Sequence, residues 1–125
     1  MKLLLDTHAL LWWLADDARL SPQARELIAD PANDVLVSAV SLWEIVVKAR
    51  IGKLEADIGE ILAAVPRNGF TRLSVEDAHL RALRDLPLHH RDPFDHLLIA
   101  QAIAEGAVFC SADAWAGRYG VRVVG

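Results

Sequence analysis

Short runs of apolar residues alternate along this chain with longer segments in which apolar and polar residues recur at helical spacing. The apolar runs predict strands over residues 3–5, 35–37, 70–73, 107–110 and 121–124. The intervening segments predict helices over residues 7–15, 22–29, 41–52, 58–65, 75–84, 92–106 and 111–116. Several of these helices carry start or stop signals, such as Ser21-Pro22, Asp92-Pro93 and Gly106.

The alternation of strands and helices predicts an α/β fold. Some of the strands are apolar throughout, so both faces of the sheet must be covered, and a parallel sheet sandwiched by helices on both faces is favoured. The 125 residues contain no internal repeat and no Gly/Ser linker, and we expect a single domain spanning residues 1–125. In sheets of this kind, functional residues gather beyond the carboxyl ends of the strands.

Composition narrows the possible functions. The hydrophobic content is 54%, above the roughly 45–50% of an average domain, which excludes disorder and leaves surplus apolar surface. A net charge of −4 argues against binding nucleic acid through a general basic field. The single cysteine, Cys110, excludes a disulfide or a Cys-rich zinc site and suits a reducing cytoplasm. No apolar run reaches the roughly 20 residues that span a membrane, and Asp6 and His8 interrupt the apolar start, which argues against a signal peptide.

Four acidic residues lie close to the ends of predicted strands. Asp6 directly follows the first strand, and Asp113 follows the fourth. Glu44 lies about one helical turn beyond the second strand, and Asp95 lies at the start of the long helix over residues 92–106. These four carboxylates are the candidates for chemistry.

Simpler structural explanations also exist for these acids. Ser41 and Glu44 have the spacing of a capping box, and Glu44 can pair with Lys48 four residues later. Asp113 can complement the dipole of a short helix. Asp77 follows a serine by three residues with the same capping pattern, and it needs no chemistry to explain it.

Asp95 is harder to explain as a helix-start residue alone. Asp92 can cap this helix, with Asp95 in its first turn, but Asp95 shares a helical face with Leu98, Ile99 and Ala102. That face should pack on the sheet, where an unpaired carboxylate costs several kcal/mol. A capping role does not require a carboxylate that points inward.

A shared cation would explain why Asp6 and Asp95 both adjoin apolar segments. Hard divalent ions such as Mg²⁺ take oxygen ligands and keep several waters, so a few converging carboxylates suffice. The chain has no H-E-x-x-H motif and no cysteine cluster, which disfavours zinc.

The acids lie within four short motifs that together extend over nearly the whole chain. The motifs are Asp6-Thr7-His8, Ser41-Leu42-Trp43-Glu44-Ile45, His90-Arg91-Asp92-Pro93-Phe94-Asp95 running into residues 97–102, and Ser111-Ala112-Asp113 with Tyr119-Gly120-Val121 downstream. They resemble the motifs of PIN-domain ribonucleases, and the third is the most specific. Within that family the chain is most similar to the VapC-type toxins of bacterial type II toxin–antitoxin pairs.

The resemblance implies a PIN-like fold and a Mg²⁺-dependent endoribonuclease, with Mn²⁺ as a substitute, that cleaves cellular RNA. It also implies a cognate antitoxin protein as inhibitor and a homodimer. Carried over position by position, Asp6, Glu44, Asp95 and Asp113 form the acidic cluster. His96 departs from the family, because relatives often carry Arg at this position; a histidine changes its charge with pH, so a constant positive contact is not expected.

Within this cluster, we expect Asp6 and Asp95 to hold the principal metal. Glu44 and Asp113 complete its shell, orient its waters or help to hold a second ion, so one metal and two metals are both open. Thr7, Ser38 and Ser111 can bind a carboxylate or phosphate, or act as caps and turn residues. Two cationic groups can contact RNA backbone or lie on solvated surface: His89-His90-Arg91, and Lys48 with Arg50 and Lys53.

The helix over residues 7–15 is apolar on nearly every side, so we expect it to be buried or to face a partner. Its Trp12-Trp13 pair is the expected partner-facing part, whereas Trp43 and Trp115 are expected in the core. The resemblance adds an antitoxin peptide lying in a hydrophobic groove near the acids.

Two other functions are consistent with the sequence. One is a non-catalytic α/β protein-interaction module whose acids are helix caps, and the other is a PIN-like nuclease acting on DNA. Carboxylates more than about 10 Å apart could not share a metal ion with Mg–O distances near 2.1 Å, so their spacing separates the first from a nuclease. Cleavage of matched RNA and DNA separates the second.

Overall fold

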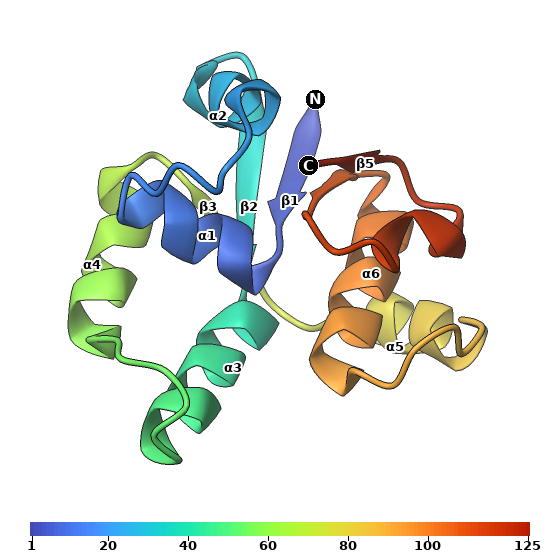
Figure 1. Ribbon diagram of the computed structural model, residues 1–125. Helices are drawn as coiled ribbons and strands as arrows, with labels where there is room; N and C mark the ends of the chain where they lie inside the picture. The colour runs from blue at the N-terminus through green and yellow to red at the C-terminus, as the bar shows by residue number, and fades with distance from the viewer.

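Five parallel strands form one sheet at the centre of the computed structural model, which describes residues 1–125 (Figure 1). The strands are β1 (Lys2–Leu5), β2 (Asp34–Ser38), β3 (Thr71–Leu73), β4 (Val108–Cys110) and β5 (Val123–Val124). Their order across the sheet is β3-β2-β1-β4-β5, and every neighbouring pair is parallel. The parallel sheet expected from the apolar runs is therefore confirmed.

Six α-helices surround the sheet: α1 (Thr7–Leu14), α2 (Pro22–Ala29), α3 (Ala39–Arg50), α4 (Ile58–Arg67), α5 (Asp77–Arg84) and α6 (Pro93–Glu105). A short 3₁₀ helix, η1 (Ala116–Tyr119), precedes β5. None of the helices combines the length and the apolar character that a membrane crossing requires.

Alternate residues of β1 and β2 point to opposite faces of the sheet, and each face has its own core. Leu3 and Leu5 belong to a first core together with residues of α1, α2, α3 and α4. Leu4 belongs to a second core, on the other face, with residues of α6 and η1. Figure 1 shows α1 and α4 separated from α5 and α6 by the strands. Apolar strands with helices on both faces are thus confirmed.

Helix α3 begins two residues earlier than the sequence indicated. The Ser38 side chain caps it by accepting a hydrogen bond from the backbone N–H of Val40 at 3.0 Å. Ser41 is instead fully buried inside the helix, and its hydroxyl has no hydrogen-bond partner. The expected capping box between Ser41 and Glu44 is therefore wrong, because Ser38 occupies the capping position.

Two other predicted helix starts are also wrong. Ser74 donates a hydrogen bond to the Glu76 side chain at 2.5 Å, and α5 begins only at Asp77, after Glu76 as N-cap. The segment from Ser111 to Trp115 is a loop, and the helical turn follows at Ala116–Tyr119. Asp113 therefore has no helix dipole to complement.

The chain places β2 and β3 on one side of β1, and β4 and β5 on the other. The order in which the chain adds strands therefore reverses between β1 and β4. There the Asp6 backbone N–H donates to the Cys110 carbonyl at 2.9 Å. Open α/β sheets bind ligands in the crevice beyond the carboxyl ends of strands at such a point.

A buried polar network anchors α6 to the second core. Gln101 is fully buried; its side-chain oxygen accepts from the Ser38 hydroxyl at 2.5 Å, and its amide donates to the Ser74 carbonyl at 3.3 Å. His79 of α5 lies 3.4 Å from the same amide, and its Nε2 lies 2.9 Å from Glu105. One side chain of α6 thus joins the end of β2 to the connection between β3 and α5.

Candidate active site

All four predicted acids line one pocket of about 300 Å³. They come from four different parts of the chain: the end of β1, helix α3, the first turn of α6 and the loop after β4. The other lining residues are Thr7, His8, Trp12, Lys48, Asp92 and Ala112. The pocket lies beside the ends of β1 and β4, where the strand order reverses, as the topology predicts.

Asp6 is fixed by the start of α1. It is the N-cap of this helix, and its Oδ1 accepts from the Ala9 backbone N–H at 2.7 Å. Only 7% of the residue is exposed. Burial raises the pKa of the Asp6 carboxyl above its ordinary value, although hydrogen bonds from Ala9 and from the Ser111 hydroxyl oppose this increase.

Glu44 is held through both of its carboxylate oxygens. Thr7 donates to Oε1 at 2.5 Å, and the Lys48 ammonium, one turn later on α3, pairs with Oε2. The hydrogen bond to Glu44 raises the pKa of Lys48, so this lysine stays charged. The predicted ion pair with Lys48 and the predicted contact from Thr7 to a carboxylate are both present.

Asp95 lies in the first turn of α6, behind the N-cap Asp92. Its backbone N–H donates to the Asp92 carboxylate at 3.2 Å, and 19% of its side chain is exposed. Burial, followed by the charges and contacts of the neighbouring acids, raises the pKa of Asp95 from 3.8 to about 8. The pocket therefore holds more negative charge than its protein groups compensate.

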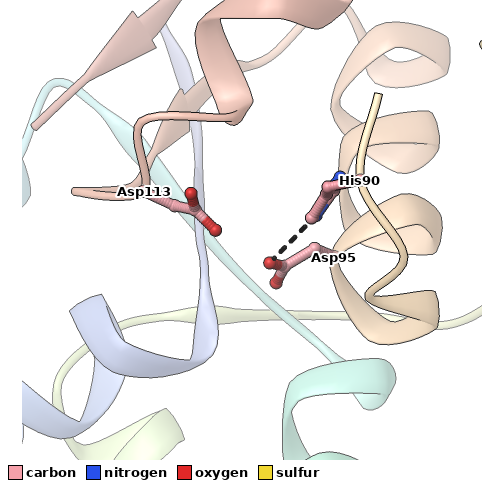
Figure 2. A group of neighbouring side chains, drawn as sticks. All are labelled: His90, Asp95 and Asp113. Atoms are coloured by element: carbon pink, nitrogen blue, oxygen red, sulfur yellow. Dashed lines mark hydrogen bonds and ion pairs between the residues drawn. The ribbon is translucent and has the colours of Figure 1, made fainter. Parts of the chain in front are cut away.

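Asp113 is the exposed member of the group and comes from the loop after β4. Its Oδ1 accepts from the Trp115 backbone N–H at 2.9 Å, which orients the side chain. Figure 2 shows Asp113 pointing toward Asp95 and His90. One possible ligand atom of each of these three residues lies within 4.8 Å of the other two.

The donor set of the pocket fits a hard divalent cation. The lining includes five carboxylates, from Asp6, Glu44, Asp92, Asp95 and Asp113, and a single lysine, which is already paired with Glu44. Carboxylate oxygens are the ligands that Mg²⁺ and Mn²⁺ prefer. A cation in this position would also relieve the repulsion that disfavours an ionised Asp95.

His90 also belongs to this site. The sequence placed it at the start of the third motif and in a cationic group with His89 and Arg91, but it indicated no contact with Asp95. Its Nε2 lies 3.5 Å from the Asp95 Oδ2 (Figure 2). The position of this histidine depends on Tyr119, whose hydroxyl oxygen lies 2.6 Å from Nδ1. No local pattern joins two residues so far apart in the chain, so only the fold could show this contact.

His96 does not line the pocket. It is buried, and its Nε2 donates to the His90 carbonyl at 2.7 Å. The sequence left open whether His96 contacts phosphate; in the structure its imidazole instead holds the loop that carries His90.

The tryptophans are arranged differently from the prediction. Trp43 is 58% exposed and Trp115 is 40% exposed, so placing them in the core is wrong. Trp43 packs edge-on against Phe94, with 4.8 Å between ring centroids. Trp12 and Trp13 are partly buried against the first core; Trp12 lines the acidic pocket, and Trp13 lines a separate groove of about 340 Å³ beside α4.

Comparisons with known proteins identify similar sequences and similar folds. The family model of the PIN domain matches residues 3–120. Ribonuclease VapC16 of Mycobacterium tuberculosis is 37% identical over 60 residues, which are 46% of this chain and 43% of that protein. The match thus spans less than half of the relative.

Solved structures share the fold at low sequence identity. VapBC2 from Rickettsia felis, solved bound to a DNA fragment from its promoter, has a TM-score of 0.76 at 16% identity, covering 99% of this chain and 98% of the other. VapBC-1 from nontypeable Haemophilus influenzae has a TM-score of 0.67 at 12% identity, covering 99% and 97%.

Proposed function

Because this chain belongs to the PIN domain family, we propose that it is a metal-dependent endoribonuclease that cleaves phosphodiester bonds in cellular RNA. We propose further that it acts as a VapC-type toxin restrained by a cognate antitoxin. The observation that carries the proposal is the convergence of Asp6, Glu44, Asp95 and Asp113 on one pocket. A set of unrelated helix caps would not bring four carboxylates together from four separate segments.

The hydrogen bonds of the acids support different roles for them. Both oxygens of Glu44 have close protein partners, Thr7 and the Lys48 ammonium, whereas Asp6 accepts from the Ala9 backbone N–H and the Ser111 hydroxyl and is paired with no lysine or arginine. Asp6 and Asp95 would therefore hold the principal Mg²⁺ or Mn²⁺, and Glu44 and Asp113 would complete the shell or orient its waters. When bound, such an ion supplies an activated water and positive charge at the phosphate.

The remaining lining residues would prepare the pocket for an anionic substrate. Lys48 neutralises Glu44 where a phosphate must approach, and Thr7 keeps the Glu44 carboxylate in place. Lys48 and His8 also line an adjoining pocket with Lys53, which extends the cationic surface away from the acids. A phosphodiester backbone could follow this surface into the site.

The proposed activity predicts metal-dependent cleavage of RNA. Purified protein should cut total cellular RNA in the presence of Mg²⁺, and EDTA should abolish the cutting. Asp6→Asn should lower the rate by a factor of about 10³ or more, because a site that loses a metal ligand loses several kcal/mol of transition-state stabilisation. Rates are measured on an end-labelled RNA fragment that the wild type cuts.

Asp77→Asn is the matched control, because Asp77 is an exposed acid in the first turn of α5 and does not line the pocket. Undiminished, EDTA-resistant cutting by Asp6→Asn would contradict the mechanism. Faster cutting of single-stranded DNA of matched sequence would favour a DNA nuclease, and no cutting of either polymer would favour an interaction module.

The apolar surface supports the proposed partners. Trp13 and Leu14 line the groove beside α4 together with Ile61 and Ala64, and this groove offers an apolar surface to an antitoxin segment. A homodimer belongs to the same proposal, and the exposed Trp43 is a candidate contact for it. The cytoplasm, where RNA and an antitoxin would be present, is the proposed location.

Metal affinity should rise with pH. The metal binds the ionised form of Asp95, but in the metal-free protein the pKa of this carboxyl is about 8. Below that pH, binding must release a proton, so the apparent affinity should increase by up to about tenfold per pH unit between pH 6 and 8 and then level off. Calorimetric titrations with Mg²⁺ in buffers of different ionisation enthalpy measure both the apparent affinity and the number of protons released.

About one proton should be released near pH 6.5 and almost none above pH 9. Asp77→Asn should reproduce the wild-type profile, because this residue lies outside the pocket. An affinity that stays constant from pH 6 to 8 would show that Asp95 is already ionised without metal.

A further inference from the structure

The hydroxyl oxygen of Tyr119 is surrounded by three polar groups. The backbone N–H groups of His89 and His90 donate to it at 3.0 and 3.1 Å, and the His90 Nδ1 lies 2.6 Å away. Tyr119 itself is 5% exposed and ends the 3₁₀ helix η1. This buried oxygen therefore organises the loop that precedes α6.

The hydrogen-bond inventory of Tyr119 determines the tautomer of His90. A phenol has one proton, and both backbone N–H groups can only donate, so the Tyr119 proton must be donated to Nδ1. With Nδ1 acting as acceptor, a neutral His90 carries its own proton on Nε2. That N–H faces the Asp95 Oδ2 at 3.5 Å.

Other contacts hold the His90 ring in this orientation. The His90 carbonyl accepts from His96 at 2.7 Å, and the ring stacks on Trp115 with an interplanar angle of 10°. Only 9% of the His90 side chain is exposed. The ring is thus fixed through its backbone, its Nδ1 and one of its faces, and Nε2 remains directed at the acidic pocket.

We propose that His90 is a positioning residue of the acidic site, which donates its Nε2–H to Oδ2 of Asp95, so that Oδ1 would be available to hold a metal ion. The inference rests on the proposed metal-dependent function. His90 acts as a donor and not as a metal ligand, because a nitrogen that carries a proton has no lone pair to offer. The separation of 3.5 Å is long for a hydrogen bond, as is common for contacts in an active site without its ligands.

Metal binding tests this role separately from RNA cleavage. Titration of the metal-free protein with Mn²⁺, followed by calorimetry and by the EPR signal of free Mn²⁺, gives the affinity of each variant. His90→Ala should weaken binding by about 10- to 100-fold, the usual effect of removing a hydrogen-bond partner of a ligating carboxylate. His90→Gln, which keeps an N–H donor, should recover part of the loss.

Tyr119→Phe should weaken Mn²⁺ binding in the same direction, because the tautomer of His90 is no longer fixed. Asp77→Asn is the control: this exposed acid lies outside the pocket, so the Mn²⁺ affinity should stay within about twofold of the wild type. Circular dichroism melting of each variant identifies any loss of folding. Nitrogen-15 NMR of the wild-type imidazoles should show His90 with its proton on Nε2.

Four results would overturn the inference. An Mn²⁺ affinity unchanged in folded His90→Ala, or a proton on Nδ1, would show that His90 does not act through Asp95. A loss confined to Zn²⁺, with Mn²⁺ and Mg²⁺ unaffected, would make His90 a ligand. A wild type that binds no Mn²⁺ would overturn this inference together with the proposed metal, whereas one that binds Mn²⁺ but cuts no RNA would overturn only the proposed activity.

Discussion

Replacing Asp95 with asparagine should abolish cleavage and, at the same time, make the metal-free protein more stable. Cleavage should fall by a factor of about 10³ or more, since a neutral amide replaces a proposed metal ligand. Stability should rise because burial and the surrounding acids disfavour the Asp95 carboxylate in the folded state, which raises its pKa to about 8. Asparagine keeps the shape of the side chain without the charge.

The pKa difference between the folded and unfolded states shows at which pH Asp95→Asn should be more stable than the wild type. The folded wild type holds the Asp95 proton up to about pH 8, whereas the unfolded chain releases it near pH 3.8. The free energy of unfolding of the wild type therefore falls as the pH rises from about 3.8 to about 8. Asp95→Asn has no titrating group at this position, so its free energy of unfolding does not fall for this reason.

Calorimetry in EDTA should show the melting temperature of Asp95→Asn higher near pH 8 by at least about 3–5 °C, which corresponds to about 1 kcal/mol in a domain of this size and is a lower bound on the contribution of the pKa difference. The difference should shrink as the pH is lowered toward 4. Asp77→Asn should change neither activity nor melting temperature, because Asp77 is exposed on α5. An Asp95→Asn protein that melts below the wild type near pH 8 would contradict the argument.

Gln101→Leu should have the opposite effect and destabilise the fold strongly. The leucine removes the acceptor of the Ser38 hydroxyl and the donor to the Ser74 carbonyl, and it does so at a fully buried position. Buried polar groups left without partners cost about 1–3 kcal/mol each, so the free energy of unfolding should fall by about 2–4 kcal/mol. The melting temperature should fall by roughly 8–16 °C.

Urea denaturation checks the size of this effect, and Gln23→Leu provides the matched control. Gln23 lies on α2 with its side chain exposed, so the same chemical change there should alter the free energy of unfolding by less than about 0.5 kcal/mol. Equal stabilities for the two variants would mean that the network around Gln101 adds nothing to the fold.

The central strands of the fold were predictable because their sequence pattern is local. Leu3–Leu5 and Val35–Val37 are apolar at every position, and a strand of that kind needs helices on both faces of its sheet. The acids were predictable for a related reason. Asp6 immediately follows a buried strand, and Asp95 shares a helical face with core residues, so each can be placed near the sheet without coordinates.

The remaining features depend on contacts between distant segments. Ser41 looks like a helix cap, but α3 already begins at Ala39 with Ser38 as its N-cap, and the Ser38 hydroxyl is held by Gln101 of α6. The contribution of His90 depends on Tyr119. The exposure of Trp43 also could not be inferred from its apolar character, because the pattern of α3 does not show which of its faces the other helices leave uncovered.

Helix α6 joins a residue whose charge weakens the fold to a residue that anchors it. If the protein is a toxin as proposed, selection would treat the two positions differently. Cells that escape killing through a substitution at Asp95 would still make a folded protein with an intact antitoxin surface. The inactive protein would compete with active toxin for the antitoxin, so less antitoxin would be left to restrain the active toxin. A protein altered at Gln101 would unfold more often and be degraded, so it would take up little antitoxin.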